Sequence, residues 1–116
     1  IGGEWKYVIE NSAGKDTFGT ATVFNSGFTE FISVSAMDAS TFVVAYRDYS
    51  NSNYGTAVVG SVSGTSITFG TETVFNSGFT DYISVSAMDA STFVVAYRDG
   101  SNSSYGTAKS VSTLDM

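Results

Sequence analysis

The chain has 116 residues and a formal net charge of −6, and it contains no histidine, cysteine or proline. Hydrophobic residues make up 42% and aromatic residues 15%, which excludes a disordered chain and leaves enough apolar side chains for one small core. The acidic balance excludes the basic surface that nucleic acid binding needs, and no apolar run is long enough to span a membrane. Strand-forming Val, Ile, Thr, Phe and Tyr dominate, so an all-β fold is predicted.

The dominant feature of the sequence is an internal repeat. Residues 18–57 align with residues 69–108 at a constant offset of 51, and only five of the 40 pairs differ. The differing pairs are Ala21/Glu72, Glu30/Asp81, Phe31/Tyr82, Tyr49/Gly100 and Asn53/Ser104. A period of about 50 residues indicates a repeat architecture, in which each unit is one supersecondary structure that packs on its neighbours.

Turn signals rich in Gly, Asn and Ser separate the predicted strands, as antiparallel hairpins require. Strands are expected first at Trp5–Glu10 and Thr17–Phe24, which correspond to the last two strands of a preceding unit. The first full unit then has four strands, at Phe31–Asp38, Thr41–Asp48, Tyr54–Val62 and Ile67–Phe75. Three of these are apolar on both faces, whereas the fourth is more polar. The second unit repeats the first three strands and lacks the fourth.

Strands with two buried faces and a polar outer strand are typical of a β-propeller blade, a four-stranded antiparallel sheet packed between two neighbouring blades. The small residues at Ser33–Ala36 suit the crowded inner position of such a blade. The chain is therefore predicted to be a single propeller unit, with residues 1–29 forming a partial blade, 30–75 a full blade and 76–116 a second blade without its outermost strand. Two alternatives remain open, a β-sandwich of two hairpin units and a β-solenoid.

Two blades cannot close a ring, because propellers have at least four blades. An isolated pair would also expose larger apolar faces than a soluble monomer tolerates. We therefore expect a homo-oligomer, a trimer or tetramer that closes a six- or eight-bladed ring by head-to-tail contacts, unless the chain is an excerpt of a longer array. In such a ring, Thr17–Phe24 of a neighbour would pair with the last strand of this chain.

In its predicted architecture and its aromatic, Gly-, Ser- and Asn-rich composition, the chain resembles the two-blade fucose-binding lectins of bacteria, whose chains trimerise into six-bladed rings. It is also similar to the repetitive propeller blades of large extracellular bacterial proteins. The resemblance implies a propeller fold, glycan binding and, together with the acidic composition, an extracellular or cell-surface location. The lectins' binding motifs are absent, and residues 61–70 lack the Asp and Trp of a sialidase Asp-box, so the resemblance assigns no binding residue.

No enzymatic activity is expected from this set of residues. Without His and Cys, the Ser-His and Cys-His nucleophile systems and ordinary zinc sites are excluded. A glycosidase needs two carboxylates in different environments, whereas Asp48 with Asp99, and Asp38 with Asp89, are repeat equivalents. The loops RDYSNSNYG and RDGSNSSYG carry one carboxylate each at the wrong spacing for a calcium loop. Neither a metal nor another cofactor is predicted.

Loops expected at one face of the two units carry groups suited to sugar binding. The candidate ligand-binding residues are Arg47, Asp48, Asn51, Tyr54, Arg98, Asp99, Asn102 and Tyr105. The preceding connection of each unit adds Asn25, Phe28, Thr29 and Glu30, and Asn76, Phe79, Thr80 and Asp81. Aromatic platforms beside planar hydrogen-bonding groups are common in sugar sites, so we predict one shallow glycan site per blade, with multivalent binding.

The alternative is that these groups serve the fold. Arg47 and Asp48 would then form an ion pair between units, while Tyr46 and Tyr54 would be packing residues. This alternative corresponds to a structural or adhesive repeat protein, natural or engineered, without a small-molecule ligand.

Overall fold

The computed structural model describes residues 17–116, and the predicted strand Trp5–Glu10 lies outside them. The described strands are β1 (Thr29–Ala36), β2 (Thr41–Asp48), β3 (Tyr54–Ser63), β4 (Ser66–Phe69), β5 (Thr73–Ala87), β6 (Thr92–Asp99) and β7 (Tyr105–Ser112). Two short 3₁₀ helices, η1 (Tyr49–Asn51) and η2 (Thr113–Asp115), follow β2 and β7. The predicted all-β class is confirmed.

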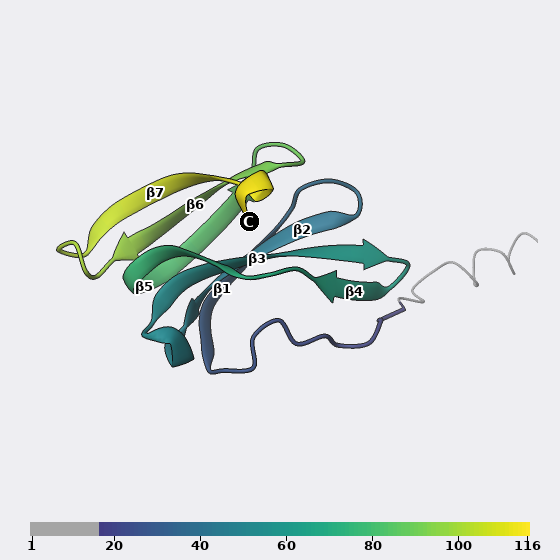
Figure 1. Ribbon diagram of the computed structural model, residues 1–116, viewed down its shortest axis with the longest axis horizontal. Coiled ribbons are helices and arrows are strands. Elements are labelled where there is room, and N and C mark those ends of the chain that lie inside the picture. Colours follow the sequence, from purple (N-terminus) through teal and green to yellow (C-terminus); the bar gives the residue numbers. More distant parts are fainter. Residues whose placement is uncertain (1–16) are drawn as a thin grey trace, which may run out of the picture.

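The strands form one antiparallel sheet that curls into half a barrel. Its order is β1-β2-β3-β5-β6-β7, and β4 pairs with the far end of β3. The long strand β5 joins the two repeats, because its first half pairs with β3 and its second half pairs with β6. Figure 1 shows the consequence, with β1 to β4 in one layer, β6 and β7 in the other, and β5 running between them.

The main core lies between these two layers. Its buried residues are Met37, Val43, Ala45, Ala57, Phe75, Ile83, Val85, Phe93, Val95 and Tyr97. Alternation along each strand separates two faces, and the residues from β2 and β3 are not the repeat equivalents of those from β5 and β6. One face of the first repeat therefore packs against the opposite face of the second repeat.

A smaller cluster covers the other face of the first repeat. Val44, Tyr46 and Val58 are buried there, with Phe24, Phe42 and Phe69 packed against them. Phe24 belongs to the segment before β1, and its ring centroid lies 5.1 Å from that of Tyr46. The N-terminal described residues thus contribute aromatic side chains to the fold.

Equivalent irregularities bend the sheet in both repeats. The pairing of β1 with β2 and that of β5 with β6 each shift register once, around Phe31 and Tyr82. Both residues have a φ of 51°, in the left-handed region that a bulky side chain uncommonly adopts. Each bulge places its aromatic ring against an arginine of the adjacent strand, Arg47 or Arg98.

Three of the predicted strands are confirmed. Thr41–Asp48 coincides with β2, and the predictions at Phe31–Asp38 and Tyr54–Val62 match β1 and β3 apart from their ends. The predicted strand Ile67–Phe75 is broken, because β4 ends at Phe69 and β5 begins at Thr73.

Two local predictions are wrong. Residues 76–80 were expected to form a connection, but they lie within β5, because the two successive strands run in line and need no turn. Residues 17–24 were expected to form a strand, but they have no regular ladder, because the described chain supplies no strand for them to pair with.

Both repeats close their first hairpin with the same Asp-Ala-Ser turn. The Asp38 carboxylate accepts a hydrogen bond from the Ser40 N–H at 2.9 Å, and the Asp89 carboxylate accepts one from the Ser91 N–H at 2.9 Å. Because these bonds favour the ionised form, they hold the pKa of both carboxyl groups below its ordinary value.

Acid should therefore destabilise the two turns. A lowered folded-state pKa stabilises the fold above the unfolded-state value of about 3.9, and that stabilisation is lost as the pH falls through the folded-state value. We expect the D38N/D89N variant, which keeps an acceptor oxygen but cannot titrate there, to show a smaller fall in melting temperature between about pH 6 and about pH 2. Equal falls for this variant and the unmodified chain in thermal melts would contradict the assignment.

Truncation of the central aromatic side chain should be costly. Phe93 is fully buried in the main core, so Phe93→Ala should lower the free energy of unfolding by about 3–5 kcal/mol. Leu114 is exposed, and Leu114→Ala should change it by less than about 0.5 kcal/mol. Urea denaturation measures both variants, and similar costs would show that the core lies elsewhere.

Candidate functional site

Arg47 is held on both sides by the fold. Its Nε donates to Glu30 Oε1 at 3.0 Å, from β2 to the adjacent β1. Its guanidinium lies 4.7 Å from the ring centroids of Phe31 and of Phe79, so two aromatic faces enclose it. Only 11% of the Arg47 side chain is exposed. Most of the hydrogen-bonding and stacking surface of Arg47 is therefore used in contacts within the fold, where the two repeats meet.

Arg98, the repeat equivalent, is more open. It makes a two-point ion pair with Asp81, through Nε at 2.9 Å and a terminal nitrogen at 2.7 Å. These hydrogen bonds raise the pKa of Arg98 above its ordinary value. Its guanidinium lies on the Tyr82 ring, and no second ring encloses it among residues 17–116. The side chain remains 46% exposed.

Asp48 and Asp99 organise the loops that follow β2 and β6. Asp48 Oδ1 accepts hydrogen bonds from the N–H of Ser50 at 3.1 Å and from its hydroxyl at 2.7 Å. Asp99 accepts the equivalent bonds from Ser101, and the Ser101 hydroxyl lowers the pKa of Asp99. Both residues are buried. The alternative of an ion pair between Arg47 and Asp48 is wrong, since the arginine pairs with Glu30 instead.

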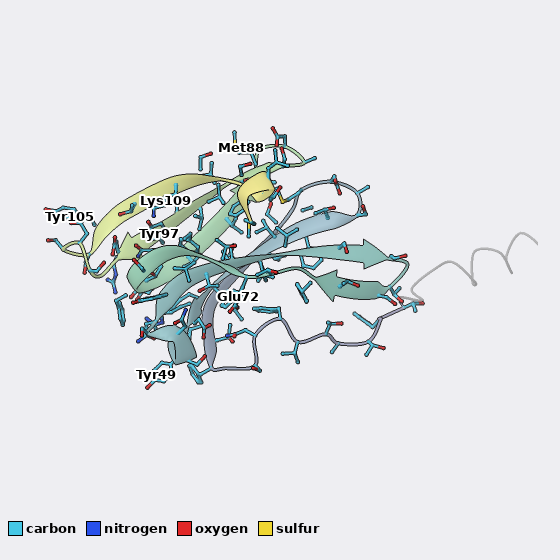
Figure 2. The ribbon with its side chains drawn as sticks, viewed as in Figure 1. Tyr49, Glu72, Met88, Tyr97, Tyr105 and Lys109 are labelled. Carbon is cyan, nitrogen blue, oxygen red and sulfur yellow. The ribbon has the colours of Figure 1, made fainter. Side chains whose placement is uncertain are left out.

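The remaining predicted residues lie at one end of the molecule but do not converge. Asn51, Asn102 and Tyr105 are exposed, and Tyr54 is partly buried at the start of β3. Figure 2 places Tyr49 and Tyr105 at this same end, where the loops after β2 and β6 emerge. The loops of the two repeats therefore face the same way, as the sequence predicted.

Two buried tyrosines belong to the packing. The Tyr46 hydroxyl donates to a Glu72 carboxylate oxygen at 2.7 Å, and burial raises the pKa of Tyr46. Burial also raises the pKa of Tyr97, whose hydroxyl has no hydrogen-bond partner among the described residues. The expectation of a packing role for Tyr46 is confirmed.

A hollow of about 470 Å³ opens at the same end of the first repeat, lined by Phe28, Glu30, Arg47 and Tyr49. The rings of Phe28 and Tyr49 meet edge to face, with their centroids 5.6 Å apart, and both are exposed. The Tyr49 N–H donates to the Phe28 carbonyl at 3.1 Å, which joins the segment before β1 to η1. The hollow thus combines an aromatic wall with a paired carboxylate and guanidinium.

Tyr49 is the lining residue that sequence reasoning missed. Arg47 was a predicted site residue, and Phe28 and Glu30 were expected at the same face. The available signal was that Tyr49 is one of the five positions at which the repeats differ. Gly100 stands at the equivalent position, so the full lining set occurs once among the described residues.

Within residues 17–116, no group of three or more His, Cys, Asp or Glu side chains is placed to hold a metal ion. No helix in this part of the chain has the length and apolar character needed to cross a membrane. Comparison of the chain with protein-family models, with curated proteins and with solved structures found no match.

Proposed function

We propose that this chain is a non-catalytic, carbohydrate-binding protein whose sugar site is the hollow lined by Phe28, Glu30, Arg47 and Tyr49. The observation that carries the proposal is the exposed aromatic pair beside a carboxylate and a guanidinium. Sugars present apolar C–H faces, which pack on aromatic rings, and hydroxyl groups, which bond to charged acceptors and donors. The lining offers both kinds of contact.

The ion pair also prepares the site. Glu30 and Arg47 are held in place by each other and by the rings of Phe31 and Phe79, so a ligand does not have to order them. The hollow is shallow and open, which suits the exposed end of a glycan and gives weak binding at a single site. Several copies on one assembly would raise the overall affinity by avidity.

We also propose that the two repeats are blades of a β-propeller completed by further copies of the chain, as a trimer or tetramer with six or eight blades. Support comes from the antiparallel order β1-β2-β3 followed by β4 and β5, and from the face-to-face packing of one repeat on the next. The hollow would then recur around the ring. We place the protein outside the cell or at its surface, where glycans are displayed.

One observation favours a second candidate function, a structural or adhesive repeat without a small ligand. Arg47, Asp48 and Asp99, all predicted to bind sugar, are engaged by other side chains of the fold. A protein built for assembly alone would need these contacts and no hollow.

The sugar proposal is tested by one substitution and its control. Tyr49→Ala removes half of the aromatic wall and should weaken binding of the glycans found on an array by about fivefold or more, since an aromatic contact contributes about 1 kcal/mol beyond its buried area. Leu114→Ala removes an exposed apolar side chain that lies outside the hollow, and should leave binding unchanged. Absence of any glycan binding, or equal losses for both variants in calorimetry, would count against the site.

The ring proposal predicts a fixed copy number. Native mass spectrometry of the unmodified chain should show three or four subunits, which give six or eight blades. A broad distribution of sizes would indicate an open array instead of a ring, and a monomer at micromolar concentration would exclude both.

A further inference from the structure

We propose that two partly exposed faces in the described part of this chain are the two halves of one head-to-tail interface, in which the second repeat of one copy receives the first repeat of the next copy. The inference names the contact surfaces of the proposed assembly, holds for a ring or an open chain, and does not depend on sugar binding. It follows from the contact that the chain already makes between its own repeats, because nearly identical residues recur 51 positions later.

The first half of the interface is a face of the second repeat. In the first repeat, the residues on this face are buried against β5 and β6, and they are Met37, Val43, Ala45 and Ala57. Their repeat equivalents are Met88, Val94, Ala96 and Ala108, and nothing in the described chain packs over them in the same way. Met37 is 8% exposed and Met88 is 68% exposed, and Figure 2 shows Met88 at the outer rim of the molecule.

The second half is the opposite face of the first repeat. Val85 is 8% exposed because the first repeat covers it, whereas its equivalent Val34 is 63% exposed. Ile83 is likewise buried, whereas its equivalent Ile32 is exposed. Val44 and Tyr46 on this face are already buried, with Phe24 and Phe69 packed against them, so the exposed part is the β1 side with Ile32 and Val34. Each exposed part carries residues whose equivalents in the other repeat already form a close-packed contact. The natural occupant of each face is a second copy of this chain.

Residues 22–28 supply the strand that crosses between copies. Their sequence, TVFNSGF, is identical to that of residues 73–79, which form the first half of β5 and pair with β3. The first occurrence has no ladder among residues 17–116, because no described strand lies in the place that β3 holds for the second. The phenylalanines of the two segments nevertheless pack in the same way. The ring centroid of Phe24 lies 5.1 Å from that of Tyr46, and the ring centroid of Phe75 lies 5.1 Å from that of Tyr97.

The partner of residues 22–28 is β7 of another copy. β7 is the repeat equivalent of β3 and lies at the edge of the sheet formed by the described strands, which pair with it on one side only. The register follows from the pairs Tyr54 with Phe79, Gly55 with Asn76 and Thr56 with Val74. Across the copies, Tyr105 lies opposite Phe28, Gly106 opposite Asn25, and Thr107 opposite Val23.

Hydrogen bonds between β5 and the serines of β1 support the same head-to-tail order. Within the chain, the Val85 N–H donates to Ser33 Oγ at 3.1 Å and the Ala87 N–H donates to Ser35 Oγ at 3.0 Å. The equivalent acceptors are the exposed Ser84 and Ser86, and the equivalent donors are the N–H groups of Val34 and Ala36. The next copy therefore supplies donors to two hydroxyl groups that this copy leaves uncovered.

Arg98 lacks one aromatic contact that its repeat equivalent Arg47 makes. Phe79 covers the second face of the Arg47 guanidinium, and its repeat equivalent is Phe28, which is exposed. Phe28 of the next copy would cover the open face of Arg98 and complete the same enclosure. The Arg98 site is thus incomplete in one chain and complete in two.

Gly106→Ala tests the interface without disturbing the fold. A Cβ at Gly55 would come within 2.6 Å of the Phe75 ring, whereas a Cβ at Gly106 meets nothing within 4 Å. In the assembly it would collide with Phe24 of the next copy. We expect the variant to keep the melting temperature of the dilute monomer and to associate about tenfold or more weakly in sedimentation experiments. The control variant Ser63→Ala changes an exposed residue at the end of β3, outside the proposed interface, and should associate like the unmodified chain.

Unchanged association of the Gly106→Ala variant would overturn the inference, and so would a monomeric unmodified chain at every concentration. Association that forms open chains of many copies would support the interface and overturn the closed ring. The two proposals can therefore fail separately.

Disulfide trapping tests the register, and the chain has no cysteine to interfere. Thr107→Cys and Val23→Cys are made in separate proteins and mixed, since paired strand positions have Cα separations that a disulfide can span. We expect a disulfide-linked dimer from the mixture and none from Thr107→Cys alone. A dimer from Thr107→Cys alone would show that two β7 edges pair with each other, which would overturn the head-to-tail arrangement, as would no dimer from the mixture.

Discussion

The structure depends on the packing of one face of the first repeat against the opposite face of the second. Val43, Ala45, Phe93 and Val95 belong to the core between the two repeats, and all four are fully buried. It fixes the path of β5, which must leave the ladder with β3 and enter the ladder with β6 so that the sheet can fold back. Because the contact uses different faces of two nearly identical units, it leaves one partly exposed face at each end of the described chain, and it does not close on itself.

A second constraint acts where the repeats join. The bulges at Phe31 and Tyr82 place aromatic rings beneath Arg47 and Arg98, and each arginine also pairs with a carboxylate from the neighbouring strand. This arrangement enforces the bend of the sheet and positions charged groups next to the loops. The proposed sugar hollow uses the exposed side of the same arrangement, so one set of contacts supports both the fold and the candidate function.

The residues of the candidate site show why sequence reasoning located it only in part. Residue type and loop position correctly brought Arg47, Phe28 and Glu30 to one end of the molecule. They did not show that Asp48 turns inward to bond Ser50, or that Arg47 lies between two rings, because both depend on contacts formed after folding. Tyr49 was not predicted because it interrupts the repeat, whereas the predicted ligand-binding residues are the same in both repeats.

Local sequence patterns were enough to predict the all-β class, the boundaries of β2 and most of β1 and β3, and the existence of two equivalent units. These features follow from local patterns of apolar, turn-forming and small residues, which act within a few positions along the chain. The other features depend on contacts between distant parts of the chain, as residues 22–28 and 73–79 show. The same seven residues form a paired strand at one position and an unpaired segment at the other, because a β-ladder requires a partner strand and the partner is set by the whole fold.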